Sequence, residues 1–355
     1  MRVLVTGAAG FLGRWVVERL LARGSDDIRC LVRPHSDHSV LQDLAQRFPQ
    51  ARLECMGGNL TAPDDARRAV EGIDLIYHLA GGMRGLPATL FLNTVVASQR
   101  LLDAIRGTDT RVVLVSSVGV YGAYDLQPGG KVEETASLDP HPHKRSAYFH
   151  AKIWQEKLFR QEAEKSHREL VVLRPGVLYG SGQPGIPGRI GPVIGSVLLQ
   201  FGGNRSLLPL SHVKNCAEAV ILAGGKREAS GQAYNVVDDN LPTVRRYVSE
   251  YRQHVKKLHT VHFPVPAGLL LSRLAEAYRR KSQGQIPAIL TEYESRVLWG
   301  GFRFDNQKIK NLGWTQLVST EEGLRQEFHT PPSLQKTTAL GSFWSTLSFS
   351  KAREP

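Results

Sequence analysis

The feature that most constrains this chain is an apolar run of strand length at residues 2–6 that leads directly into the stretch Gly7-Ala8-Ala9-Gly10-Phe11-Leu12-Gly13. A pattern of helical period follows and ends near Gly24. In this context Gly7 permits a tight turn, Gly10 lets the backbone approach a pyrophosphate, and Gly13 allows close packing of helix on strand. The helix N-terminus then faces the anion. The first 24 residues therefore predict a dinucleotide site.

The rest of the chain repeats this alternation of apolar, strand-length runs with helical segments. Such runs, with little polar alternation, are typical of a parallel sheet covered by helices on both faces. The expected strands cover residues 2–6, 28–32, 52–55, 75–79, 111–116, 170–173 and 232–237, and expected helices include 90–105, 147–164 and 214–223. The sequence predicts an α/β, doubly wound parallel Rossmann sheet with a smaller, mostly helical C-terminal substrate lobe.

The boundaries of these two parts follow from where the pattern changes. Residues 1–175 and 211–238 are expected to form the nucleotide-binding domain, and residues 176–210 and 239–329 the substrate lobe. The Gly- and Pro-rich stretch 180–205 predicts a loop with at most a short helix. The polar, Ser/Thr-rich residues 330–355 predict a poorly ordered tail.

The cofactor preference is indicated by the residue that follows the second strand. About twenty residues past Gly13, an NAD site would present Asp or Glu to the ribose hydroxyls, whereas this chain has Arg33. A guanidinium matches a 2′-phosphate in charge and fork geometry. NADP is therefore the favoured cofactor. NAD remains an alternative, because some NAD sites lack the Asp or Glu that binds the ribose hydroxyls.

Three polar residues predict the chemistry. Ser117 lies at the carboxyl end of the expected strand 111–116, and Tyr148 and Lys152 lie four residues apart at the start of the next long helix, on one face of it. A nearby ammonium stabilises a phenolate and lowers the pKa of the phenol, which suits Tyr148 to proton transfer. Ser117 is positioned to bond a substrate carbonyl or alcohol.

Taken in order, these motifs resemble the extended short-chain dehydrogenase/reductase family, also known as the NAD-dependent epimerase/dehydratase family. The resemblance spans about residues 1–329 and also includes His78-Leu79-Ala80-Gly81, Asn93 and Leu173-Arg174-Pro175-Gly176-Val177-Leu178-Tyr179-Gly180. It implies catalytic roles for Ser117, Tyr148 and Lys152, with Asn93 supporting the site. The residues assigned to the cofactor are Gly7, Gly10, Phe11, Leu12, Gly13, Arg33, Asn59, Leu60, Leu79, Ala80, Gly81, Tyr148, Lys152 and Pro175. No metal is expected.

The substrate class follows from departures from the family pattern. Val177 stands where nucleotide-sugar enzymes of the family commonly have an Asn that touches the sugar-nucleotide phosphates, and Asn59 replaces the usual Asp near the adenine. The pattern is closest to dihydroflavonol reductase and 3β-hydroxysteroid dehydrogenase members. An oxidoreductase acting on an alcohol or carbonyl, with an apolar substrate as one option, is favoured. A nucleotide-sugar epimerase or dehydratase and a non-catalytic NADP-sensing protein are the alternatives.

The net charge of +12 and the cysteine content bear on partners and location. Part of the charge is expected to serve an anionic cofactor, and there is no basic run with interleaved aromatic residues, so nucleic acid is not an expected partner. Three scattered cysteines and no apolar leader or spanning run favour a cytoplasmic location. A homodimer is an option. Residues 263–281 join an apolar stretch to a basic end; a core-packed helix is favoured over contact with a membrane surface or a substrate mouth.

Overall fold

The computed structural model describes residues 1–83, 85–180, 185–281 and 291–329. Its centre is a seven-stranded sheet in the order β12-β7-β5-β4-β1-β2-β3, and every neighbouring pair is parallel. The strands are β1 (Val3–Thr6), β2 (Asp27–Val32), β3 (Arg52–Gly57), β4 (Leu75–His78), β5 (Arg111–Val115), β7 (Leu170–Pro175) and β12 (Ala233–Val236). The predicted doubly wound parallel sheet is confirmed.

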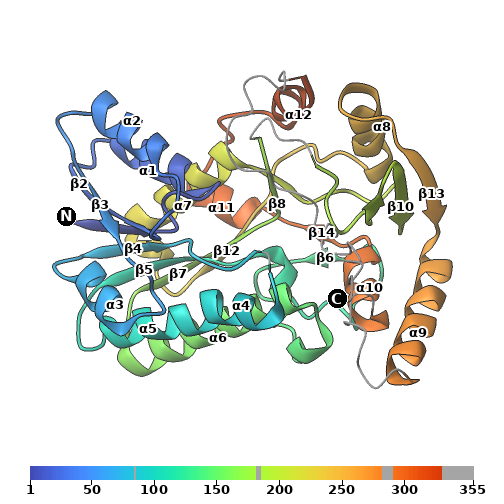
Figure 1. Ribbon diagram of the computed structural model, residues 1–355, viewed down its shortest axis with the longest axis horizontal. Coiled ribbons are helices and arrows are strands. Elements are labelled where there is room, and N and C mark those ends of the chain that lie inside the picture. The colour runs from blue at the N-terminus through green and yellow to red at the C-terminus, as the bar shows by residue number, and fades with distance from the viewer. Residues whose placement is uncertain (84, 181–184, 282–290, 330–355) are drawn as a thin grey trace, which may run out of the picture.

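Helices cover both faces of this sheet (Figure 1). One layer contains α1 (Gly13–Ala22), α2 (Ser39–Arg47) and α7 (Val213–Gly225), and the other contains α3 (Pro63–Val70), α5 (Ala97–Ala104) and α6 (Ala147–Ser166). Within β1, Val3 and Val5 point into the core on one face and Leu4 into the core on the other. Because both faces are buried, the strand is apolar throughout, as the sequence pattern indicates.

The second part of the molecule holds the shorter elements. The small sheets pair β13 (His259–Phe263), β10 (Val197–Phe201) and β9 (Val193–Ile194), then β11 (Leu210–His212) with β8 (Val177–Tyr179), and β14 (Arg303–Phe304) with β6 (Lys131–Val132). Around them lie α8 (Val244–His254), α9 (Val265–Lys281), α10 (Glu292–Trp299), α11 (Gln307–Asn311) and α12 (Thr320–His329). In the described part of the chain, no helix is both long and apolar enough to cross a membrane.

The prediction of a loop over residues 180–205 is wrong in part. Val193–Ile194 and Val197–Phe201 form an antiparallel hairpin, and Gly195 in the connection has φ of +62°. Glycine is suited to this left-handed conformation, so a residue that suggested a loop in fact closes a hairpin. The expected tail, residues 330–355, lies outside the described residues.

Candidate active site

The glycine loop after β1 is folded as tightly as the motif predicts. Gly7 has φ of +71°, and a Cβ added there would lie 3.0 Å from the backbone nitrogen of Ala80. A Cβ on Gly13 would lie 2.1 Å from the carbonyl oxygen of Gly7, and the Gly10 N–H donates to that same oxygen at 2.9 Å. No side chain can be accommodated at Gly7 or Gly13 without moving backbone. The loop with the N-terminus of α1 therefore forms a cradle of the shape a dinucleotide pyrophosphate requires.

The loop after β4 closes the other side of this cradle. The Ala80 N–H donates to Thr6 Oγ1 at 3.3 Å, and the Gly82 N–H donates to Thr94 Oγ1 at 2.8 Å. This places Leu79 and Ala80 against Gly7, and Gly81 near Thr94 and Lys152. The site lies where the strand order changes direction, because β2 and β4 flank β1 on opposite sides. In open parallel sheets ligands bind at the carboxyl edge at such a switch point.

Two arginines lie on the α2 side of the cradle. Arg33 follows β2, is exposed, and has no ion-pair partner among the described residues. Arg14 lies in the first turn of α1, where its Nε is buried without a hydrogen-bond partner in the described structure, and burial lowers the pKa of its guanidinium. Glu18, one turn later on the same face, binds Arg47 of α2 at 2.8 Å, so Arg14 faces the same side of α1.

Arg14 is not among the site residues predicted from the sequence, although its position in the first turn of the helix could have indicated an anion site. A cation in the first turn of a helix lies at the positive end of the helix dipole, which is unfavourable without an anion nearby. The guanidinium is 5.7 Å from the centre of the Phe11 ring and 5.9 Å from that of Trp15. These rings hold Arg14 beside the glycine loop.

The other residues expected to contact the cofactor are placed along the same edge of the sheet. Asn59 Oδ1 accepts from the Thr61 N–H at 3.1 Å and the Asn59 N–H donates to Asp65 at 2.8 Å, a turn that starts α3. Leu60 is buried, and Pro175 ends β7 in the core. Adenine contact by Asn59 stays a prediction.

Ser117 and Tyr148 occupy the positions that the motifs predict. Ser117 follows β5 and caps a short 3-10 helix, Val118–Val120, with its Oγ accepting from the Gly119 N–H at 3.1 Å. Tyr148 lies in the first turn of α6 and is half-buried. Burial raises the pKa of Tyr148 to about 12. This is opposite to the lowering expected from a nearby ammonium, so Tyr148 holds its proton at neutral pH.

Lys152 is buried one turn into α6, and its ammonium is already bound on two sides. Nζ donates to the carbonyl oxygen of Val115 at 2.8 Å and to Gln155 Oε1 at 2.6 Å. Burial lowers the pKa of Lys152 to about 8, with the Glu156 carboxylate acting in the opposite direction. An ammonium has three N–H donors, so one is left for a ribose hydroxyl or for Tyr148.

A buried polar network fixes the orientation of the Gln155 amide. Gln155 Nε2 donates to Ser98 Oγ at 2.8 Å and to the Ala80 oxygen at 3.3 Å, and lies 3.2 Å from His78 Nε2. His78 Nδ1 is 2.8 Å from Thr6 Oγ1, and burial lowers the pKa of His78 to about 3, which keeps the ring neutral.

Every donor in this network has an acceptor if His78 carries its hydrogen on Nε2. The Thr6 hydroxyl then donates to His78 Nδ1, and the ring donates to Ser98 Oγ at 3.0 Å. The Ser98 hydroxyl donates to the Thr94 carbonyl at 2.6 Å. With both N–H groups of Gln155 engaged by Ser98 and Ala80, its oxygen must face Lys152.

A buried ion pair supports the same helix. Glu156 and Arg174 are fully buried, with Arg174 Nη2 2.5 Å and Nε 3.2 Å from the two carboxylate oxygens. The Arg174 guanidinium lies 4.4 Å from the centre of the Tyr121 ring, and the Tyr121 hydroxyl donates to Asn235 at 2.6 Å. The pair ties α6 to β7, so Glu156 joins Gln155 as a supporting residue that the sequence reasoning did not single out.

Asn93 falls within the expected helix 90–105, where the backbone is not a regular α-helix throughout. The helix that carries it begins at Pro87 as α4 (Pro87–Phe91), and Asn93 lies in a π-helical stretch, Leu92–Val96, before α5. Such single π turns occur frequently at functional sites. Its neighbour Thr94, rather than Asn93, makes the bond to the loop after β4. The supporting role of Asn93 stays a prediction.

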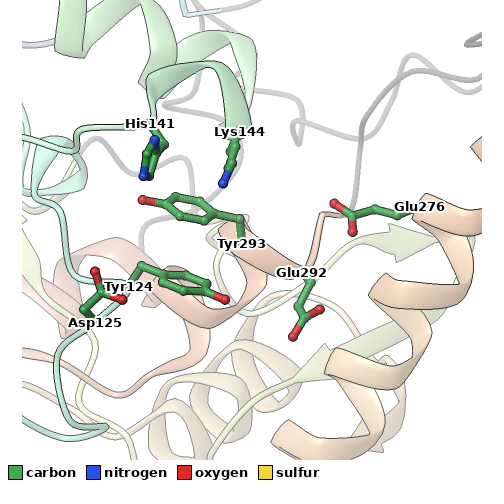
Figure 2. Close-up of a pocket in the computed structure, with 7 residues that line it drawn as sticks. All are labelled: Tyr124, Asp125, His141, Lys144, Glu276, Glu292 and Tyr293. Atoms are coloured by element: carbon green, nitrogen blue, oxygen red, sulfur yellow. The ribbon is translucent and has the colours of Figure 1, made fainter. Parts of the chain in front are cut away.

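A cavity of about 310 Å³ lies outside the set of predicted site residues (Figure 2). Two of the residues lining it, Tyr124 and Tyr293, are stacked with ring centres 4.5 Å apart, and the Tyr293 hydroxyl donates to the buried Asp139 at 2.7 Å. Glu292 also lines the cavity and is bound by Arg273 and Arg296. None of the residues assigned to catalysis or cofactor lines this cavity.

Comparison with known proteins identifies the family. The model of the NAD-dependent epimerase/dehydratase family matches residues 3–236, which is more than half of the chain. The chain belongs to this family. The resemblance drawn from the motifs is thereby confirmed, and members of the epimerase/dehydratase family are enzymes that use a nicotinamide dinucleotide.

Relatives of this family member carry more than one activity in their names. An uncharacterized UDP-glucose epimerase of Bacillus subtilis is 29% identical over 282 residues, covering 74% of this chain and 85% of the relative. A decarboxylating sterol-4-alpha-carboxylate 3-dehydrogenase of Candida albicans is 25% identical over 349 residues, covering 91% and 95%. The solved UDP-glucose 4-epimerase of Thermus thermophilus, in complex with NAD, has a TM-score of 0.65 at 21% identity and covers 92% of this chain and 98% of that one, which shows the shared fold.

Proposed function

We propose that this protein is an NADP-dependent reductase of a carbonyl group on a substrate that is not a nucleotide sugar. The observation that carries the proposal is the pair of cations, Arg14 and Arg33, on the side of the glycine cradle where an NAD site would present a carboxylate. Arg33 is free in the described structure and the Nε of Arg14 is buried without a partner, so both are available to a 2′-phosphate.

The dinucleotide, when bound, supplies the hydride; the chain supplies position and a proton. Gly7, Gly10 and Gly13 leave room for the pyrophosphate, and Lys152 offers its remaining N–H to the nicotinamide ribose. Tyr148 is protonated at neutral pH because burial raises its pKa to about 12, which suits it to donate a proton to a carbonyl oxygen. Ser117 Oγ lies at the end of β5, where it orients that oxygen.

The substrate assignment is supported by Val177 and by the relatives. Val177 is in β8, and its apolar side chain has no amide to offer a nucleotide-sugar phosphate. A relative that covers nearly the whole chain is named as a sterol-carboxylate dehydrogenase, which favours an apolar ketone or alcohol. The relative named as a UDP-glucose epimerase supports the alternative function, a nucleotide-sugar epimerase. The cytoplasmic location, a homodimer and the division into two lobes stay predictions.

The proposed preference for NADP is tested by titrating the purified protein with NADPH and with NADH and following the fluorescence of the nucleotide. Each charge-assisted contact to the 2′-phosphate contributes about 1.5–3 kcal/mol, or roughly 10- to 150-fold in affinity. Arg14→Ala and Arg33→Ala should each weaken NADPH binding within this range and leave NADH binding unchanged. Arg106→Ala, an exposed cation that precedes β5 and so lies at the amino edge of the sheet, is the matched control. NADH binding as tight as NADPH binding in the wild type would refute the role of both arginines.

The proposed carbonyl reduction is tested by following NADPH oxidation with ketosteroids, aldehydes, flavonoid-like ketones and UDP-sugars. Tyr148→Phe should abolish turnover of whichever ketone is reduced and leave NADPH affinity nearly intact. An active Tyr148→Phe variant would remove Tyr148 from the mechanism. Cofactor that stays bound through purification, together with thermal stabilisation by a UDP-sugar and no ketone reduction, would establish the epimerase instead.

A further inference from the structure

The outward face of α9 is apolar, whereas its packed face carries small residues. Leu270, Leu274 and Tyr278, four residues apart, are 58%, 59% and 63% exposed. On the opposite side, a Cβ on Gly268 would lie 2.9 Å from the Trp299 ring, and Ser272 Oγ bonds Ser295 Oγ of α10 at 2.8 Å. A surface helix normally buries its large apolar side chains. The favoured expectation of a core-packed helix is therefore wrong for this face.

The same region is strongly basic. Residues 251–281 contain seven Lys and Arg residues and one acid, Glu276. Arg273 is paired with Glu292 of α10, whereas Arg252, Lys256, Lys257 and Lys281 are exposed and have no ion-pair partner among the described residues. Figure 1 shows that β13 and α9 follow one another along an outer edge of the molecule. Val261 of β13 is 45% exposed and adds to the apolar surface of this edge. A continuous edge therefore combines exposed apolar side chains with an excess of cations, and we call it the α9 edge.

The combination of apolar and cationic groups limits which class of partner can bind the α9 edge. A two-fold contact between copies would bring the α9 edge against itself, so Lys256, Lys257 and Lys281, which have no ion-pair partner in the described structure, would face the same cations of the second copy. A nucleic acid would satisfy the charges and leave the leucines in water. An anionic bilayer satisfies both, because its head groups attract Lys and Arg and its acyl layer accepts leucine.

We propose that the α9 edge docks this protein on an anionic lipid surface, with Leu270, Leu274 and Tyr278 entering the acyl boundary. The helix lies on the bilayer and does not cross it, since α9 also carries Arg273 and Glu276. A single helix connects this edge to the catalytic helix: α10 bonds α9 through Ser295, and its Glu294 carboxylate accepts from the Ser146 N–H that opens α6.

Sedimentation of the full chain with vesicles tests the proposal. The wild type should bind vesicles of phosphatidylcholine and phosphatidylglycerol in equal parts at 0.1 M salt, release at 0.5 M salt, and leave vesicles of pure phosphatidylcholine unbound. Leu270→Ser with Leu274→Ser should lower the partition coefficient at least about tenfold, because each leucine loses its transfer energy into the acyl layer. Both side chains are exposed, so the fold should be retained.

The matched control replaces two exposed apolar residues away from the α9 edge, Val40→Ser with Leu317→Ser, and should bind vesicles like the wild type. The proposal is overturned if the wild type does not bind the anionic vesicles, or if the α9 variant binds them as well as the control variant does. It is also overturned if light scattering shows a wild-type dimer that becomes a monomer only in the α9 variant, because a second copy would then cover the edge. Ketone reduction and NADPH affinity report separately on the proposed function.

Discussion

Replacing Gln155 by leucine and, separately, by glutamate should move the pH at which Lys152 loses its proton in opposite directions. Gln155 Oε1 accepts from Lys152 Nζ at 2.6 Å in a buried site. A hydrogen bond from a charged donor contributes about 1.5–3 kcal/mol, and 1.36 kcal/mol corresponds to one pH unit. Starting from the Lys152 pKa of about 8, leucine should lower that pKa by roughly one to two pH units. Glutamate should raise it, because a carboxylate beside the ammonium stabilises the charged form.

The assay is the pH dependence of turnover. In the proposed mechanism Lys152 works as an ammonium, so the rate falls on the alkaline side as Lys152 deprotonates. Tyr148, with a pKa raised to about 12, keeps its proton across this range. The midpoint of the alkaline limb should therefore lie below that of the wild type in Gln155→Leu and above it in Gln155→Glu, with NADPH oxidation followed between pH 6 and pH 10.

A control variant separates this effect from a general loss of packing. Gln99 lies on α5 and bonds Asp103 at the surface. Gln99→Leu and Gln99→Glu should therefore leave the midpoint of the alkaline fall in rate at its wild-type pH. If both Gln155 variants keep the wild-type midpoint, or if both move it in the same direction, Gln155 does not act on the charge of Lys152. A drop in rate at every pH with an unchanged midpoint would show a structural role only.

Three further substitutions test the supports of the site. Gly13→Ala brings a methyl group to 2.1 Å from the Gly7 oxygen, so NADPH should no longer raise the melting temperature; an undiminished thermal shift would contradict the cradle. Glu156→Gln leaves the Arg174 guanidinium buried without its counter-charge and should lower the free energy of unfolding by about 3–5 kcal/mol in urea titrations; a loss below about 1 kcal/mol would show that the pair matters little. Folded His78 stays neutral because burial lowers its pKa to about 3, whereas the unfolded state takes up the proton below about pH 6.5. Between pH 6 and pH 4 the wild type should therefore lose about 1.4 kcal/mol of stability per pH unit more than His78→Asn does, and parallel pH profiles of the two would contradict this.

The sequence predicted those parts of the site that depend on short spacings. The glycine loop, Ser117 at a strand end, and Tyr148 one turn before Lys152 are local patterns, and each lies on the expected element. The supports could not be predicted in this way. Gln155 obtains its orientation from Ser98, Ala80 and His78, which come from other elements of the sheet edge. The raised pKa of Tyr148 likewise arises from burial, which spacing does not show.

The orientation of α9 shows how a sequence can indicate an amphipathic helix and still leave its direction open. Leucines and a tyrosine at intervals of four define a stripe, and that stripe fits a core-facing helix as well as an outward-facing one. What separates the two cases is the opposite face. Gly268 and Ser272 are small enough for α10 to approach closely, with Trp299 against Gly268, and this contact turns Leu270 and Leu274 outward. A close helix contact on small residues thus reverses the usual direction of the apolar face, and the exposed stripe becomes a surface available for binding.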